Sequence, residues 1–129
     1  NQAFSLTTGQ STSTSQEGFV SKVKPSGEEF FPLNPIKLAL TSGARFVARC
    51  NARDIQHTKQ ILQKAMQFKG FSYVEIIQEC LIFNPSKEMY GLMYKIPDNS
   101  DKKKAEKLAD EWDYNRKKGK IPLGVIWKE

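Results

Sequence analysis

The first residues of the chain carry groups that suit the binding of a cation and a phosphate. Residues 1–10 combine the amide of Asn1, the hydroxyl groups of Thr7 and Thr8, and a glycine at position 9. Magnesium prefers oxygen ligands, and turns that contain glycine can present backbone N–H groups to a phosphate. Composition alone favours a solvated loop, because serine, threonine and glycine are common in such loops.

The thiol of Cys80 is a second candidate, because it follows directly after a predicted strand. The only other cysteine is Cys50. Two cysteines are too few for a disulfide framework, so we expect reduced thiols, one of which could be a metal or cluster ligand. Taken alone, a single cysteine such as Cys80 is more often a core thiol than a ligand.

The chain carries no self-contained catalytic motif. It has no P-loop, no GxGxxG, no HExxH and no CxxC, and its single histidine, His57, has no nucleophile nearby in the sequence. We expect His57 to be a surface residue, and zinc binding is improbable with one histidine and two distant cysteines. The catalytic residues stay unassigned.

Start and stop signals define the elements that must position these groups. Asn34 before Pro35 predicts a short helix that ends at Gly43, and Asp54 begins a second helix that ends at Gly70. Apolar runs over residues 46–49 and 73–77 predict two buried strands that flank the second helix. Strand, helix and strand in this order predict a right-handed parallel βαβ unit.

Ligands of such sheets bind beyond the carboxyl ends of the strands. Arg49 and Cys80 both come at or after a predicted strand end. We therefore expect them to lie at one functional edge of the sheet.

The remaining segments complete an α/β fold with helices on the faces of a parallel sheet. We predict a single domain over residues 1–129, with a long loop over 1–34, the βαβ core over 35–83, and a C-terminal helix and strand over 84–129. Within the last part, residues 84–101 look irregular and 102–118 read as a helix. Residues 121–127 read as a terminal strand, in which Pro122 favours an edge or a strand start.

The charge balance leaves one other class of function open. The 20 Lys and Arg residues outnumber the 14 Asp and Glu residues and give a net charge of +6. Much of the basic excess lies within residues 102–120, where it alternates with acidic residues as on a solvated helix. The alternative function is a small basic module that binds nucleic acid. We expect no membrane span and no secretion signal, and hence a cytoplasmic protein.

Several linked motifs resemble the β subunits of 2-oxoacid:ferredoxin oxidoreductases. NQAFSLTTGQ followed by STSTS resembles their LTxGQ-SPTS segment, and NPIKLALTSGARFVAR resembles their NP-LALA-GA-FVAR stretch. KAMQFKGFSYVEIIQEC resembles KAI-HKGF-VEV-SPC, and IPLGVIWKE resembles their closing IPIG segment. The resemblance implies the C-terminal half of a domain that binds thiamine diphosphate.

The resemblance also implies roles for individual residues. The side chain of Asn1 and the backbone carbonyl of Ala3 would ligate Mg²⁺. Cys80 would join three cysteines from the N-terminal half on a four-iron four-sulfur cluster. The residues that would line the cofactor and the 2-oxoacid pocket are Leu6, Thr7, Gly9 and Gln10.

The implied reaction is the oxidative decarboxylation of a 2-oxoacid to an acyl-coenzyme A, with electrons passed to ferredoxin. The implied partners are an α subunit, ferredoxin, coenzyme A and the 2-oxoacid, and nucleic acid is not expected. The GDG half of the cofactor motif and the other cluster cysteines are absent from these 129 residues, so we expect the chain alone to be inactive. Thr8, Ser13 and Glu79 depart from the usual family residues, and Thr8 leaves the substrate preference open.

Overall fold

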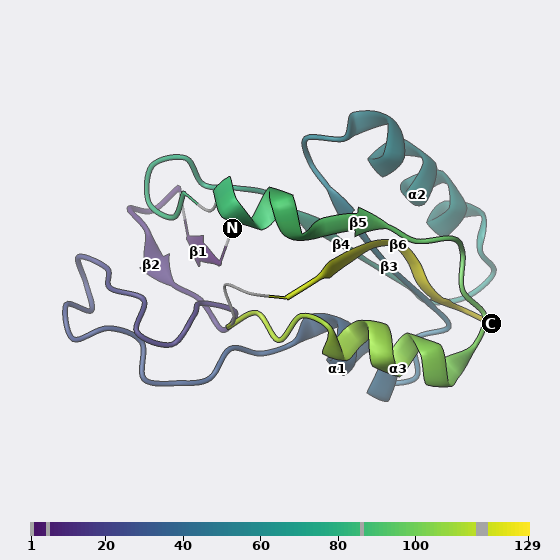
Figure 1. Ribbon diagram of the computed structural model, residues 1–129, viewed down its shortest axis with the longest axis horizontal. Helices are drawn as coiled ribbons and strands as arrows, with labels where there is room; N and C mark the ends of the chain where they lie inside the picture. The colour runs from purple at the N-terminus through teal and green to yellow at the C-terminus, as the bar shows by residue number, and fades with distance from the viewer. Residues whose placement is uncertain (1, 5, 86, 116–118) are drawn as a thin grey trace.

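A four-stranded sheet lies between helices on both of its faces (Figure 1). The computed structural model describes residues 2–4, 6–85, 87–115 and 119–129. In spatial order the strands are β4 (Ser72–Ile77), β3 (Phe46–Asn51), β6 (Ile121–Lys128) and β5 (Met93–Lys95). The helices are α1 (Pro35–Thr41), α2 (Ile55–Gln67) and α3 (Lys102–Asp110). Helix α2 covers one face, and α1 and α3 lie together on the other.

The predicted βαβ unit is confirmed. Strands β3 and β4 are parallel, with Phe46 opposite Ser72 and Asn51 opposite Ile77, and α2 connects them. Asp54 caps α2 by accepting a hydrogen bond of 3.0 Å from the His57 backbone N–H. Because capping satisfies an N–H group that the helix leaves unpaired, such residues fix where a helix begins.

Strand β3 is the centre of the core because every one of its residues is buried. Val47 packs with apolar residues of α1 and α3, whereas Phe46 and Ala48 pack against the side of α2 that carries Ile61. Successive side chains of a strand point to opposite faces, so β3 supplies both apolar layers.

The complete sheet is mixed, because β6 runs antiparallel to β3 and parallel to β5. Strand β6 is therefore an interior strand, which excludes the edge position, the first of the two alternatives expected for Pro122. Pro122 is the second residue of β6, which agrees with a strand start. Further along, Gly124 has φ +140°, and a Cβ there would lie 2.8 Å from the Ile96 carbonyl oxygen, so glycine allows the two segments to meet.

The third helix is shorter than predicted. Helix α3 ends at Asp110 instead of residue 118, and residues 116–118 lie outside the described part. Trp112 and Tyr114 leave the helical path, and both are buried next to Arg49. Tyr114 has φ +66°, which a helix cannot contain. Burial of two aromatic side chains against the core therefore overrides the helical pattern of the sequence.

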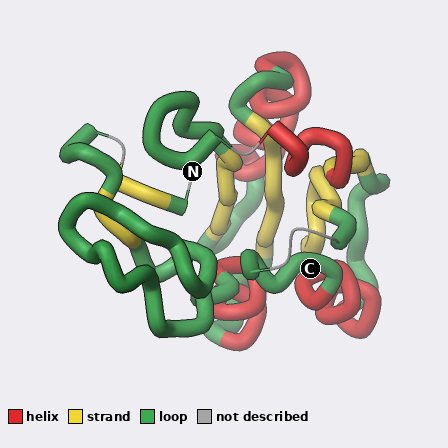
Figure 2. The backbone as a smooth tube through the Cα atoms, turned by 60° about the vertical axis from the view of Figure 1, so that its left-hand side comes forward, coloured by secondary structure: helices red, strands yellow, loops and turns green. Residues whose placement is uncertain are grey.

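The described residues before α1 form a long loop with a small hairpin of β1 (Ala3–Phe4) and β2 (Gln10–Ser11). Figure 2 shows this hairpin and the outer loop that follows it on one side of the main sheet. The stretch expected to be irregular contains a 3₁₀ helix, η1 (Lys87–Leu92), and the short strand β5. No helix among the described residues is long and apolar enough to span a membrane.

Candidate functional site

The hairpin loop and the segment after β4 meet at the carboxyl end of β4. We call the loop that was expected to bind the cofactor, residues 2–4 and 6–15, the cofactor loop, and residues 80–84 the Cys80 turn. The ring of Phe83 in the Cys80 turn lies directly against Gly9 of the cofactor loop. Gln2 shares the wall of a small cavity with Ile77, Gln78 and other residues that end β4. The fold thus brings together the two segments that the sequence singled out.

Local hydrogen bonds hold the cofactor loop in a tight turn. The N–H of Gly9 donates to the Phe4 carbonyl over 2.7 Å, and the hydroxyl of Thr7 donates to the amide oxygen of Gln10 over 2.7 Å. Thr8 and Gly9 have φ values of +83° and +82°. Glycine adopts this left-handed conformation at little energetic cost. A side chain at position 9 would also collide with the ring of Phe83, so both the backbone conformation and the contact favour glycine there.

The predicted cofactor residues differ in exposure. Leu6 is 97% exposed and Thr7 is exposed, so both can meet a bound molecule. Ala3 and Gly9 are buried, and for Ala3 only the backbone carbonyl was expected to bind. Asn1 lies outside the described residues.

The two cysteines have different environments. Cys80 lies three residues beyond β4 and is buried. Its backbone forms an isolated antiparallel β-bridge with Asn84, and its sulfur accepts a hydrogen bond of 3.3 Å from the Phe83 backbone N–H. Cys50 lies inside β3, and its thiol donates to the Glu75 carbonyl over 3.7 Å. Burial raises the pKa of the Cys50 thiol. Cys50 is therefore a core thiol, and Cys80 is the ligand candidate.

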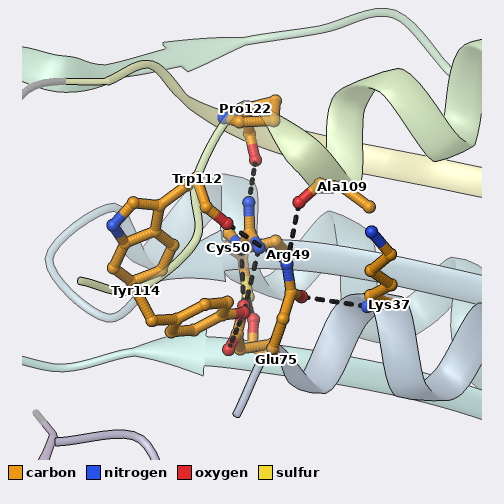
Figure 3. A network of polar contacts seen from close by, with 9 residues as sticks. Lys37, Arg49, Cys50, Glu75, Ala109, Trp112, Tyr114 and Pro122 are labelled. Atoms are coloured by element: carbon orange, nitrogen blue, oxygen red, sulfur yellow. Dashed lines mark hydrogen bonds and ion pairs between the residues drawn. The ribbon is translucent and has the colours of Figure 1, made fainter. Parts of the chain in front are cut away.

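Arg49 does not emerge at the edge of the sheet, so this expectation is wrong. Strand β3 continues for two residues beyond Arg49, so Arg49 lies inside the strand. Its side chain is 0% exposed. Its Nε donates to a Glu75 carboxylate oxygen over 2.5 Å, and its Nη2 donates to the Tyr114 hydroxyl over 3.0 Å (Figure 3). Burial opposes the charge on Arg49, but Glu75 and Tyr114 together outweigh the effect of burial and raise the Arg49 pKa.

Two aromatic rings close this buried network. Trp112 and Tyr114 are stacked with their centroids 4.0 Å apart, and the Arg49 guanidinium lies 5.1 Å from the Trp112 ring centroid. The Tyr114 hydroxyl donates to Glu75 over 2.5 Å, and burial raises the Tyr114 pKa. Each charge in the network is thus paired or faces an aromatic ring, as a charge in the core requires.

Gln2 joins this network to the cofactor loop. Its side-chain N–H₂ donates to the carbonyls of Thr14 and Tyr114 over 2.7 Å and 2.6 Å. Ser15 donates from its hydroxyl to the Gln2 carbonyl over 2.6 Å. Gln2, Trp112 and Tyr114 also line a cavity of about 70 Å³ at the end of β4. Sequence reasoning missed these three residues because no local pattern links positions more than 100 residues apart.

The single histidine has no partner that would make it catalytic in the described structure. His57 is partly buried in the first turn of α2, and burial together with the charge of Lys95 lowers its pKa. Among the described residues, no three His, Cys, Asp or Glu side chains are grouped so that they could hold a metal ion.

The comparison with protein families identifies the chain. Residues 1–76 match the model described as "Thiamine pyrophosphate enzyme, C-terminal TPP binding domain". The chain belongs to the thiamine pyrophosphate enzyme family. The match includes the cofactor loop and all but the last residue of the βαβ unit. Thiamine pyrophosphate is another name for thiamine diphosphate.

Individual relatives agree with this family. The chain is 31% identical over 140 residues to the β subunit of 2-oxoacid:ferredoxin oxidoreductase from Saccharolobus solfataricus. The matched region covers 99% of this chain and 46% of that protein. It is 42% identical over 84 residues to 2-oxoglutarate oxidoreductase subunit KorB from Mycobacterium tuberculosis, over 65% of the chain and 22% of that protein.

A solved structure has the same fold. The 2-oxoglutarate:ferredoxin oxidoreductase from Magnetococcus marinus, solved with 2-oxoglutarate, coenzyme A and succinyl-CoA bound, matches with a TM-score of 0.89 and 32% identity. The match covers 100% of this chain and 45% of that one. The predicted resemblance to these β subunits is therefore confirmed. The chain spans less than half the length of the Saccharolobus solfataricus and Magnetococcus marinus proteins. The comparisons do not support the alternative of a nucleic-acid module.

Proposed function

We propose that the chain forms the downstream half of the cofactor site in a 2-oxoacid:ferredoxin oxidoreductase β subunit. The complete enzyme would convert a 2-oxoacid and coenzyme A to acyl-coenzyme A and carbon dioxide, and would pass the electrons to ferredoxin. The observation that carries this proposal is the contact between the cofactor loop and the Cys80 turn at the carboxyl end of β4. Parallel sheets bind their ligands at this edge.

The cofactor loop fits magnesium and a diphosphate in its chemistry. Asn1 would supply an amide oxygen and Ala3 a backbone carbonyl to Mg²⁺, which takes oxygen ligands and shares them with phosphates. The glycine at position 9 leaves room for the Phe83 ring. The backbone N–H groups of a turn that contains glycine can face a phosphate. Leu6, Thr7 and Gln10 would line the space for the cofactor and the 2-oxoacid.

The Cys80 turn fits an iron–sulfur cluster. Clusters are held by thiolates, and hydrogen bonds to the sulfur atoms tune their reduction potential. The sulfur of Cys80 accepts an N–H hydrogen bond. The other three cluster cysteines would come from the upstream half of the subunit.

When bound, thiamine diphosphate supplies the electron sink that the decarboxylation of a 2-oxoacid needs. The residues of this chain would hold the metal and the diphosphate and exclude water from the pocket. The Arg49 network would fix Gln2, which stands between the two proposed magnesium ligands. No side chain of the described part is assigned as an acid or base.

The complete site needs other chains and the upstream half. We propose an α subunit, ferredoxin, coenzyme A and a 2-oxoacid as partners, and a cytoplasmic location, where free thiols such as those of Cys50 and Cys80 stay reduced. The isolated chain would be inactive.

Substitution of Asn1 tests the proposal. In the complete β subunit, Asn1→Ala removes one oxygen ligand of the cation, so the magnesium-dependent affinity for thiamine diphosphate falls at least about tenfold, equivalent to about 1.4 kcal/mol. Isothermal titration calorimetry with and without Mg²⁺ measures this affinity. Gln56→Ala, on the exposed side of α2, removes another amide and serves as the control. Equal affinity in the Asn1 and Gln56 variants would contradict the proposal.

A further inference from the structure

Phe83 contacts both segments of the proposed site. A Cβ built on Gly9 would lie 2.7 Å from Cγ of the Phe83 ring, so the ring packs directly on the glycine backbone. Phe83 is partly buried by this contact, whereas its neighbours Leu81 and Ile82 are 65% and 81% exposed. Of the three apolar side chains in the turn, Phe83 is the one that is not exposed.

The backbone of Phe83 contacts the cysteine at the same time. Its N–H lies 3.3 Å from the Cys80 sulfur, and the next N–H, of Asn84, donates to the Cys80 carbonyl over 3.3 Å. The position of the Phe83 N–H therefore depends on the position of the Cys80 turn. Because the ring and the N–H belong to one residue, Phe83 connects Gly9 directly to the sulfur.

We propose that Phe83 is a positioning residue that couples the cofactor loop to the cluster ligand Cys80. The proposal rests on the proposed function and deepens it, because it names the connection between the two cofactor sites. Magnesium and diphosphate bound at the cofactor loop would steady Gly9 and, through the ring of Phe83, the Cys80 turn, so that the N–H of Phe83 bonds to the sulfur for a larger share of the time than it does without the cofactor. Hydrogen bonds to ligating sulfur atoms raise the reduction potential of a cluster.

The backbone at Gly9 supports this role. Gly9 has φ +82° and is buried, so the loop reaches Phe83 only because it lacks a side chain there. The β1–β2 hairpin fixes both ends of the loop, since Ala3 pairs with Ser11 and Phe4 with Gln10. Gly9 is thus tied to the hairpin pairing on both sides.

The test compares two turn residues in the complete β subunit with its cluster. Phe83→Ala removes the contact with Gly9, Phe83→Leu keeps most of the apolar volume, and Ile82→Ala is the matched control in the same turn. The cluster midpoint potential is measured by electron paramagnetic resonance titration with and without magnesium and thiamine diphosphate. Cofactor affinity is measured by circular dichroism titration in the absence of a 2-oxoacid.

In the native subunit we expect the cofactor to shift the midpoint potential upward. By linkage, the affinity for thiamine diphosphate then differs between the subunit with an oxidised cluster and the subunit with a reduced cluster, by about fivefold or more. Phe83→Ala should abolish the shift and make both affinities equal, Phe83→Leu should reduce the shift, and Ile82→Ala should keep the native shift. A role in stability alone would lower the melting temperature and leave the shift in place.

A native-sized shift in the folded Phe83→Leu and Phe83→Ala variants would overturn the proposal, as would the absence of a shift in the native subunit. In both cases the proposed function still stands if the native subunit binds the cofactor and the cluster. If Cys80→Ser leaves the iron content unchanged, the proposed function of Cys80 fails and this inference fails with it.

Discussion

Arg49 shows how one buried charge shapes the structure around the site. Its guanidinium is paired with Glu75, donates a hydrogen bond to the Tyr114 hydroxyl and faces the Trp112 ring. A buried charge needs such partners because removal from water is costly. Both aromatic residues leave the end of α3 to reach it, and the Tyr114 carbonyl holds Gln2. The network therefore links the centre of the sheet to the cofactor loop.

Removal of the carboxylate charge from this network should destabilise the fold. Glu75→Gln leaves Arg49 charged and fully buried, so we expect a loss of about 3 kcal/mol in the free energy of unfolding, measured by urea denaturation. The matched control is Asp110→Asn, which breaks the exposed pair with Lys37 and should cost less than about 1 kcal/mol. Equal losses in the two variants would show that the buried pair has no special weight.

Glu28 gives the outer loop a dependence on pH. Its hydrogen bond from Lys24, followed by one from Ser11, lowers the Glu28 pKa from 4.5 to about 2. A carboxyl group with a lowered pKa stabilises the folded state above its ordinary pKa, and this contribution is lost as the pH falls from 4.5 towards 2. Hydrogen exchange of the Phe30 amide, which donates to Glu28 over 3.4 Å, should therefore gain protection between pH 3 and pH 5 once corrected for intrinsic rates. Glu28→Gln should remove this pH dependence, and a wild-type dependence in that variant would contradict the assignment.

At the scale of elements, capped and periodic segments could be predicted from the sequence. Asn34 and Asp54 cap their helices as expected, and the parallel pairing of β3 and β4 follows from the length of the crossover. The end of α3 and the interior position of β6 could not be predicted, because both depend on contacts between distant segments. The same limit applies to the site: motif resemblance led to the cofactor loop and Cys80, but not to Gln2 or Tyr114.

The close approach of β6 to the segment before α3 gives an element-scale prediction. Gly124→Ala places a Cβ 2.8 Å from the Ile96 carbonyl oxygen at φ +140°, so we expect a loss of more than about 1 kcal/mol in the free energy of unfolding. Gly91→Ala is the control, because nothing in the described structure lies within 4 Å of a Cβ there. Thermal unfolding of both variants decides the point, and equal melting temperatures would refute the steric argument.

At the scale of the whole molecule, the chain covers less than half of the length of its relatives. The proposed site would include residues from the rest of the β subunit. We expect the isolated chain to bind magnesium and thiamine diphosphate at least about a hundredfold more weakly than the complete β subunit, because a shared cation loses more than one ligand. Titration calorimetry on both proteins makes the comparison. Equal affinities would mean that these 129 residues contain the full cofactor site.

The position of the bound cation tests the central claim most directly. Manganese can replace magnesium, and its unpaired electrons broaden nearby nuclear magnetic resonance signals. In the complete β subunit with thiamine diphosphate, we predict that Mn²⁺ broadens the amide signals of Ala3, Thr7 and Gly9 more strongly than those of α3. Broadening that is strongest at Lys102–Asp110, with the signals of the cofactor loop unchanged, would contradict the account.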